Sequence, residues 1–102
     1  MMNVDSVLSK DNKVLFIGVK GKFDFSMLNE FRAAYSNDAV KDLNIIVDMR
    51  NTSTIDSSAL GMLLNMQRYL NKRDGEIEII NCNQDIKKVL NITRFDKKFG
   101  VK

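Results

Sequence analysis

The 102-residue sequence contains no histidine, no proline and no tryptophan, and it has one cysteine, Cys82. Without histidine the chain lacks the commonest general base and the commonest metal ligand. A single cysteine excludes an internal disulfide, and Cys82 follows an apolar strand pattern, where we expect it to act as a small hydrophobic residue. No cysteine–histidine cluster suits zinc, and no glycine-rich phosphate loop is present. We therefore predict neither a metal nor a cofactor.

Charge and hydropathy argue against two further classes of protein. Sixteen Lys and Arg against thirteen Asp and Glu give a net charge of +3 with the signs interspersed, which does not indicate a nucleic-acid partner. No apolar run is long enough to cross a bilayer, and residues 1–9 lack the pattern of a secretory signal. We expect a cytoplasmic protein without direct membrane insertion. A solvated helix face accounts for the basic residues near the C-terminus, Lys87, Lys88, Arg94, Lys97, Lys98 and Lys102.

Hydrophobic patterning predicts strands that alternate with helices. An N-terminal hairpin is expected over residues 4–10 and 14–19, with a turn at Asp11-Asn12. A strand buried on both faces is expected over residues 44–49, and a further strand over 76–80, which alternates and then becomes apolar. We interpret residues 50–54 as a polar connection. The order of elements predicts an α/β fold in one domain, residues 1–102. It contains a mixed, mostly parallel sheet of about four to five strands, with the hairpin first and about three to four helices.

The helices are placed by their apolar spacing and by capping residues. Residues 27–36 predict a helix with Ser26 as its N-cap, and residues 57–72 predict a longer one that ends at Asp74-Gly75. Asn83 is expected to cap a last helix. Phe95 and Phe99 are expected to fasten the C-terminal tail to the core.

The stretch from Thr54 to Leu64 joins the end of an apolar strand to the longest amphipathic pattern. Either Asp56 or Ser57 suits the N-cap, which places Ser58 in the first helical turn, where free N–H groups and the helix dipole favour an anion. Capping is the commonest role of serines at such a place. A serine nucleophile needs a positioned base; histidine is absent and no Ser-x-x-Lys begins here, so we do not expect an enzyme.

A helical wheel divides this helix into two sides. The core side is expected to hold four leucines, Leu60, Leu63, Leu64 and Leu70. Beside Ser58 the wheel predicts a mixed strip, adaptable near its methionines, that suits a protein partner: Gly61, Met62, Asn65 and Tyr69. The alternative interpretation is that Met62 and Met66 belong to the periphery of the core and that Asn65 is incidental.

These residues resemble the signature of STAS domains, and most of all the stand-alone anti-sigma factor antagonists of the SpoIIAA type. The matching segment runs from the apolar strand 45–48 to Ile55-Asp56-Ser57-Ser58-Ala59-Leu60-Gly61, and Gly21-Lys22-Phe23-Asp24 resembles the family's Gly-x-Leu-Asp. The order of elements agrees from about residue 4 to residue 100. Two positions depart from the pattern: Ala59 stands where glycine is usual, and Arg50 stands where a small residue is common.

The resemblance implies a phosphorylation switch in transcription regulation by partner switching. Ser58 is the implied phosphoacceptor, with Ser57 as the competing acceptor and Thr52, Ser53 and Thr54 as secondary sites. Asp24 and Asp56 are implied to shape the docking surface. The implied partners are an anti-sigma factor or a serine kinase of the histidine-kinase-like ATPase type, and a PP2C-like serine phosphatase, either alone or fused to a response regulator. The alternative is a non-phosphorylated STAS scaffold subunit of a transporter or stress-signalling complex.

Overall fold

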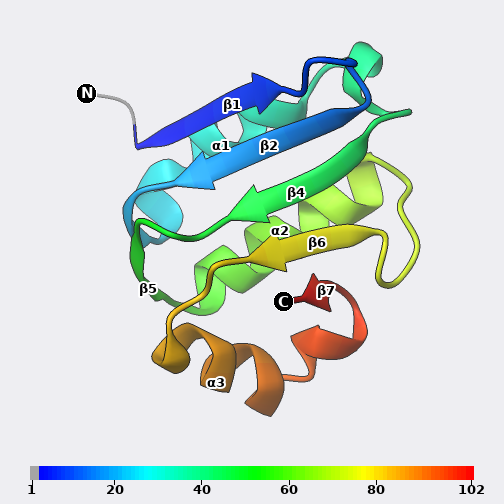
Figure 1. Cartoon of the computed structure of the whole chain (residues 1–102). Helices are drawn as coiled ribbons and strands as arrows, with labels where there is room; N and C mark the ends of the chain where they lie inside the picture. Colours follow the sequence, from blue (N-terminus) through cyan, green and yellow to red (C-terminus); the bar gives the residue numbers. More distant parts are fainter. Residues whose placement is uncertain (1–2) are drawn as a thin grey trace.

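A computed structural model describes residues 3–102 of the protein. A five-stranded sheet forms its centre (Figure 1). The strand order is β1-β2-β4-β6-β7. β1 pairs antiparallel with β2, and every other neighbouring pair in this sheet is parallel. The mixed, mostly parallel sheet and its N-terminal hairpin are confirmed. The strands are Val4–Leu8, Val14–Val19, Asn44–Asp48, Ile77–Ile80 and Gly100–Val101 in that order.

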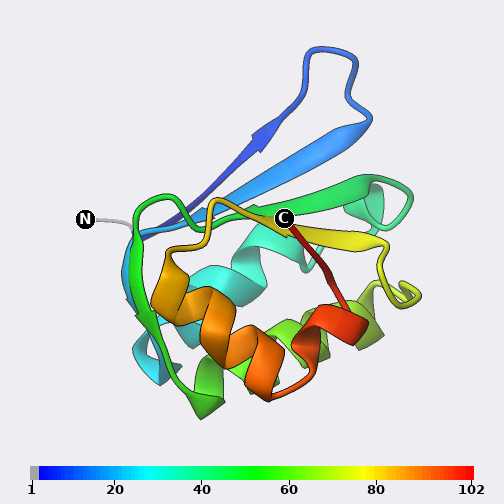
Figure 2. The same cartoon turned by 60° about the horizontal axis from the view of Figure 1, so that its bottom comes forward.

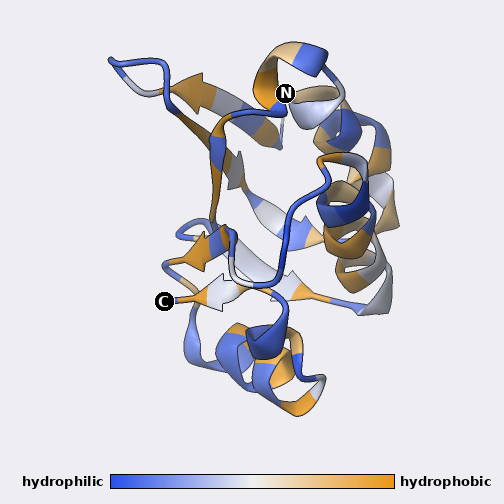
Figure 3. Cartoon of the chain, turned by 90° about the vertical axis from the view of Figure 1, so that its right-hand side faces the viewer, coloured by the Kyte–Doolittle hydropathy of each residue, from blue (hydrophilic) through white to orange (hydrophobic). Residues whose placement is uncertain are grey.

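The three α-helices within residues 3–102 all lie on one side of the sheet (Figure 2). They are α1 (Leu28–Tyr35), α2 (Ser57–Tyr69) and α3 (Gln84–Ile92). Alternate strand residues point towards these helices and are buried, while the intervening residues face the uncovered side. Hydrophilic residues predominate in the connections, whereas hydrophobic residues occur in both the strands and the helices (Figure 3). No helix within residues 3–102 is long and apolar enough to cross a membrane.

The C-terminal tail is packed as the sequence predicts, but it also adds a strand. Phe95 and Phe99 are buried and stack with ring centroids 5.8 Å apart. Phe95 opens the 3-10 helix η3 (Phe95–Lys97), after which Gly100 and Val101 form β7 against β6. A two-residue strand has too short a pattern to be recognised by alternation. The basic residues that we interpreted as a solvated face are exposed.

The connection that we predicted after β4 is not irregular. Thr52–Ile55 forms β5, which pairs in parallel with β3 (Gly21–Phe23) in a separate two-stranded sheet. Both strands are short, and β5 consists mainly of hydroxyl residues that resemble a loop in composition. Tertiary pairing, rather than local hydrophobic alternation, makes this segment a strand.

The end of one helix also differs from the prediction. α2 ends at Tyr69 because Asn71 adopts φ of 54°, and the N–H groups of Asn71 and Lys72 bond to the carbonyls of Arg68 and Gln67. This is a Schellman motif with asparagine in the left-handed position, so Gly75 lies in the later turn before β6. The first strand is shorter than the predicted 4–10, because β1 ends at Leu8. In the hairpin turn that follows, Asn12 has a φ of 58°.

Candidate functional site at the β3–β5 corner

The small β3–β5 sheet brings together two aspartates that are 32 positions apart in the sequence. Phe23 of β3 is the register partner of Ile55 of β5, and Asp24 and Asp56 are the next residues along each chain. Neighbouring strands lie about 4.8 Å apart, so the two aspartates follow side by side. Asp56 then caps α2, while Asp24 caps the 3-10 helix η1 (Phe25–Met27) that leads into α1.

Hydrogen bonds from outside the small sheet fix this corner to the main fold. The hydroxyl of Thr52, which is 4% exposed, donates to the carbonyl of Val19 at 2.7 Å. The side-chain amide of Asn83 donates to the carbonyl of Ser53 at 3.1 Å, while its oxygen accepts from the N–H of Ile86 and caps α3 as predicted. β5 is therefore tied to β2 on one side and to the start of α3 on the other.

Ser58 and Asp56 form a closed hydrogen-bonded turn at the start of α2. Asp56 has an extended backbone, and its Oδ1 accepts from the N–H of Ala59 at 3.0 Å and from the hydroxyl of Ser58 at 2.6 Å. The hydrogen bond from Ser58, followed by that from Ala59, lowers the pKa of the Asp56 carboxyl below its ordinary value of 3.8. Asp56 is thus the N-cap, one of the two alternatives that the sequence left open. Ser57 and Asp56 are exposed, and Ser58 is half-buried.

Asp24 repeats this arrangement in the neighbouring turn. Its Oδ1 accepts from the N–H of Ser26 at 2.9 Å and from the hydroxyl of the same residue. We predicted Ser26 as the N-cap of a helix over residues 27–36, but α1 begins after Met27, which makes no side-chain capping bond. Asp24 instead caps the preceding 3-10 helix η1, because its carboxylate reaches the free N–H two residues on, and Ser26 lies inside that turn. Between them Phe25 is 67% exposed. Sequence reasoning missed Phe25; the matching spacing of Asp24-x-Ser26 and Asp56-x-Ser58 was the available signal.

Only part of the predicted strip along α2 reaches the surface. Gly61 and Asn65 are exposed, and Tyr69 is 42% exposed. Met62 is 3% exposed and Met66 fully buried, so the placement of Met62 on the exposed strip is wrong. Both methionines pack in the hydrophobic core with Leu63 and Leu70, whereas two of the predicted core leucines are only partly buried, Leu60 and Leu64. The wheel misassigned these positions because Leu and Met are equally apolar, and tertiary packing decides which of them is central.

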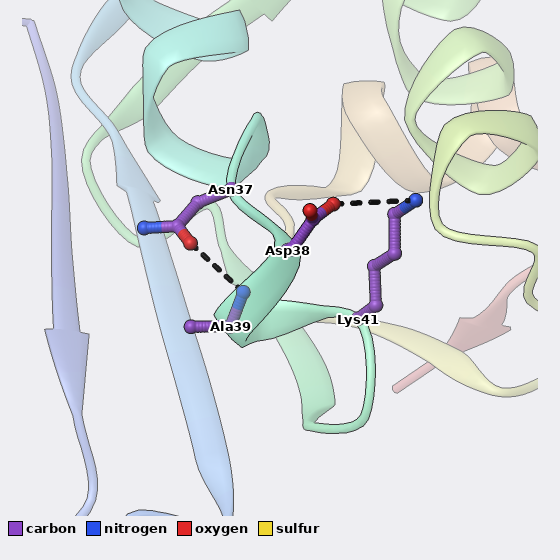
Figure 4. Close-up of polar contacts among 4 residues, drawn as sticks. All are labelled: Asn37, Asp38, Ala39 and Lys41. Atoms are coloured by element: carbon purple, nitrogen blue, oxygen red, sulfur yellow. Dashed lines mark hydrogen bonds and ion pairs between the residues drawn. The ribbon is translucent and has the colours of Figure 1, made fainter.

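A groove of about 480 Å³ lies between α1 and α2, farther from the corner. Tyr35 is largely enclosed, and burial raises the pKa of its phenol. The rings of Tyr35 and Tyr69 pack edge to face, with their centroids 5.6 Å apart. Lys41 lies 5.0 Å from the centre of the Tyr69 ring and pairs with Asp38 at 3.5 Å (Figure 4). Tyr69 is therefore held by its neighbours and is less available than exposure alone suggests. The groove is lined by Arg32, Tyr35, Ser36, Asn65 and Tyr69.

The chemistry available at the corner is binding of charge rather than metal coordination. Within residues 3–102 no three His, Cys, Asp or Glu side chains come close enough to hold a metal ion. Cys82 is half-buried, and burial raises the pKa of its thiol, which leaves it a poor nucleophile at neutral pH. The corner presents two carboxylates, two capped turns and hydroxyls at the start of a 13-residue helix.

Comparison with known proteins agrees with this geometry. Residues 6–102 match the STAS domain family. The chain belongs to the STAS domain family. A STAS-domain containing protein of Pseudomonas aeruginosa (strain UCBPP-PA14) is 35% identical over 100 residues, which cover 98% of this chain and 99% of that protein. The fold and family predicted from the Asp56–Gly61 segment are therefore confirmed.

Solved structures of STAS proteins share the fold at lower identity. The unphosphorylated form of the anti-sigma factor antagonist SpoIIAA has a TM-score of 0.64 and 21% identity over 87% of this chain and 82% of that one. The phosphorylated form of the Bacillus cell fate determinant SpoIIAA has a TM-score of 0.67 and 19% identity, over 97% of this chain and 90% of that one. A sulfate transporter family protein from Wolinella succinogenes has a TM-score of 0.69 and 17% identity, over 91% of this chain and 79% of that one. At these identities the likeness establishes the fold alone.

Proposed function

We propose that this STAS domain is an anti-sigma factor antagonist, a non-enzymatic binding switch controlled by phosphorylation of Ser58. Its unphosphorylated form binds an anti-sigma factor or a switch serine kinase of the histidine-kinase-like ATPase type, and its phosphorylated form does not. A PP2C-like serine phosphatase, alone or fused to a response regulator, restores binding. The observation that carries the proposal is the hydrogen bond from the Ser58 hydroxyl to Asp56 Oδ1 at an exposed corner.

Phosphorylation of Ser58 would turn its attractive contact with Asp56 into a repulsive one. The hydroxyl now donates to a carboxylate, but a phosphate has a charge of about −1.5 to −2 and only acceptor oxygens at neutral pH. Asp56 and the adjacent Asp24 then repel the new group and favour its rotation towards solvent, where a partner would meet it. An unpaired like charge in an interface costs several kcal/mol, so a decrease in affinity of about a hundredfold or more is expected.

The fold should survive this change because the core does not take part in it. Asp56 still accepts from the N–H of Ala59, and Ser58 is not among the residues that form the hydrophobic core. The helix dipole and the free N–H groups of the first turn also favour a negative group there. Local charge, rather than a change of shape, is therefore the proposed signal. Ser57 is exposed beside Ser58 and remains the competing acceptor.

A pair of variants tests the proposal. Ser58→Ala and Ser58→Glu proteins are used as baits in extracts of the native cell, and each retained protein is purified and titrated by calorimetry. We expect Ser58→Ala to retain an anti-sigma factor or serine kinase, and Ser58→Glu to lose it while its circular dichroism spectrum stays unchanged. Equal affinity of both variants would contradict the proposal.

One observation favours a second function, a scaffold subunit that is not phosphorylated. The STAS fold of a sulfate transporter family protein is as similar to the fold of this chain as that of SpoIIAA is. Co-purification of wild-type protein with a membrane protein, together with an intact mass that shows no phosphate, would favour this alternative.

A further inference from the structure

The side chain of Phe25 is unusually exposed for an aromatic residue in this protein. Five of the eight aromatic side chains are buried, and Phe16 and Tyr69 are 36% and 42% exposed, whereas Phe25 is 67% exposed. Its ring contributes little to the hydrophobic core. Aromatic side chains supply much of the binding energy where they enter pockets of a partner protein.

The backbone on both sides of Phe25 is hydrogen-bonded. Before it, Asp24 accepts from the N–H groups of Ser26 at 2.9 Å and of Met27 at 3.0 Å, through its side chain and its carbonyl respectively. After it, the N–H of Leu28 donates to the carbonyl of Phe25. The ring therefore projects from a turn that is already ordered, so a partner that buries it does not have to order the backbone.

Phe25 is also continuous with the corner that carries Ser58. Because Phe23 is in register with Ile55, the turn that begins at Asp24 follows β3 just as the turn that begins at Asp56 follows β5. Phe25 thus directly follows Asp24, in the turn beside the one that Asp56 begins, and no aromatic side chain other than Phe25 lies within either turn.

We propose that Phe25 is the apolar anchor by which the partner that senses Ser58 docks on this protein. The matching surface on that anti-sigma factor or serine kinase is an apolar pocket whose rim carries cationic side chains or N–H donors for Asp24 and Asp56. The anchor supplies affinity, and Ser58 supplies the control. The inference rests on the proposed function, because the partner is the one that distinguishes Ser58→Ala from Ser58→Glu.

Phe25→Ala tests the anchor, and Ile92→Ala is its matched control, since Ile92 is 73% exposed but lies at the end of α3. The probe is the purified anti-sigma factor or serine kinase that Ser58→Ala retains, titrated by calorimetry. We expect Phe25→Ala to raise the Kd about 30-fold or more, as for a truncated interface hot spot, and Ile92→Ala to leave it within twofold. Thermal melts should show both variants folded.

A crosslinking measurement keeps the test independent of any effect of truncation on folding. Benzoylphenylalanine placed at position 25 should crosslink to the same partner on irradiation, and placed at position 92 it should not. If Phe25→Ala binds within threefold of wild type, or position 25 gives no crosslink, the anchor is wrong, while the proposed function stands as long as Ser58→Glu still loses binding. If Ser58→Glu binds like wild type, or Ser58→Ala retains no such partner, the proposed function fails and the anchor with it.

Discussion

Replacing Thr52 by valine should loosen the corner that carries Ser58. Thr52 is 4% exposed, and its hydroxyl donates to the Val19 carbonyl at 2.7 Å, which ties β5 to the end of β2. Valine keeps the shape and removes the donor. The loss of a buried hydrogen bond costs about 1–2 kcal/mol once the desolvation of the remaining carbonyl is included. For a domain of this size each kcal/mol lowers the Tm by about 4–8 °C, so we expect a decrease of about 4–16 °C.

Urea unfolding followed by circular dichroism measures this cost, and Thr54→Val is the control. Thr54 belongs to the same strand but is exposed, so its replacement should change the free energy of unfolding by less than about 0.5 kcal/mol. Both variants should keep the wild-type m-value, since the surface exposed on unfolding is unchanged. If Thr52→Val unfolds at the same urea concentration as wild type, the hydroxyl does not hold the corner.

Three further changes test neighbouring parts of the account. Ser58→Ala removes the largest cause of the lowered Asp56 pKa, so carboxyl NMR should show that pKa rise towards 3.8. The stability linked to this carboxylate is present above pH 3.8 and is lost as the pH falls through the lowered pKa. An unchanged Asp56 pKa in the variant would exclude the hydrogen bond in solution. Met66→Ala should lower the free energy of unfolding by about 2–5 kcal/mol, whereas Asn65→Ala should change it by less than about 0.5 kcal/mol; similar values for both would refute the burial of Met66. At Asn71, with φ of 54°, substitution by valine should cost about 1–2 kcal/mol in thermal unfolding and substitution by glycine should not; equal effects would contradict the left-handed helix end.

The long apolar patterns carried enough information to predict the main sheet. The runs at residues 14–19 and 44–49 are too apolar for exposed strands, residues 76–80 alternate before they become apolar, and each of the three segments contains a strand of the five-stranded sheet. The Asp56–Gly61 segment identified the family because it combines a strand end, a cap and a helix start in a fixed order. Local sequence is informative where one segment satisfies several physical requirements at once.

Features that depend on pairing between distant segments were missed. β3 and β5 have few apolar residues of their own, and their pairing becomes visible only when Gly21 and Thr52 meet. The burial of Met62 likewise depends on how α2 is turned against the sheet, which a helical wheel of equally apolar residues does not determine. The exposure of Phe25 is a third example, because phenylalanine is among the residue types most often buried, and composition does not show that this one lies in an exposed turn.

The position of the phosphate tests the central claim most directly. Wild-type protein and the Ser58→Ala variant are purified from the native cell, and the phosphate is located by intact mass and fragmentation. We predict one phosphate on Ser58 in part of the wild-type protein, its absence from Ser58→Ala, and no binding of the partner by the phosphorylated fraction. A phosphate on Ser57 alone, or a phosphorylated protein that binds its partner as tightly as the unphosphorylated one, would contradict the account.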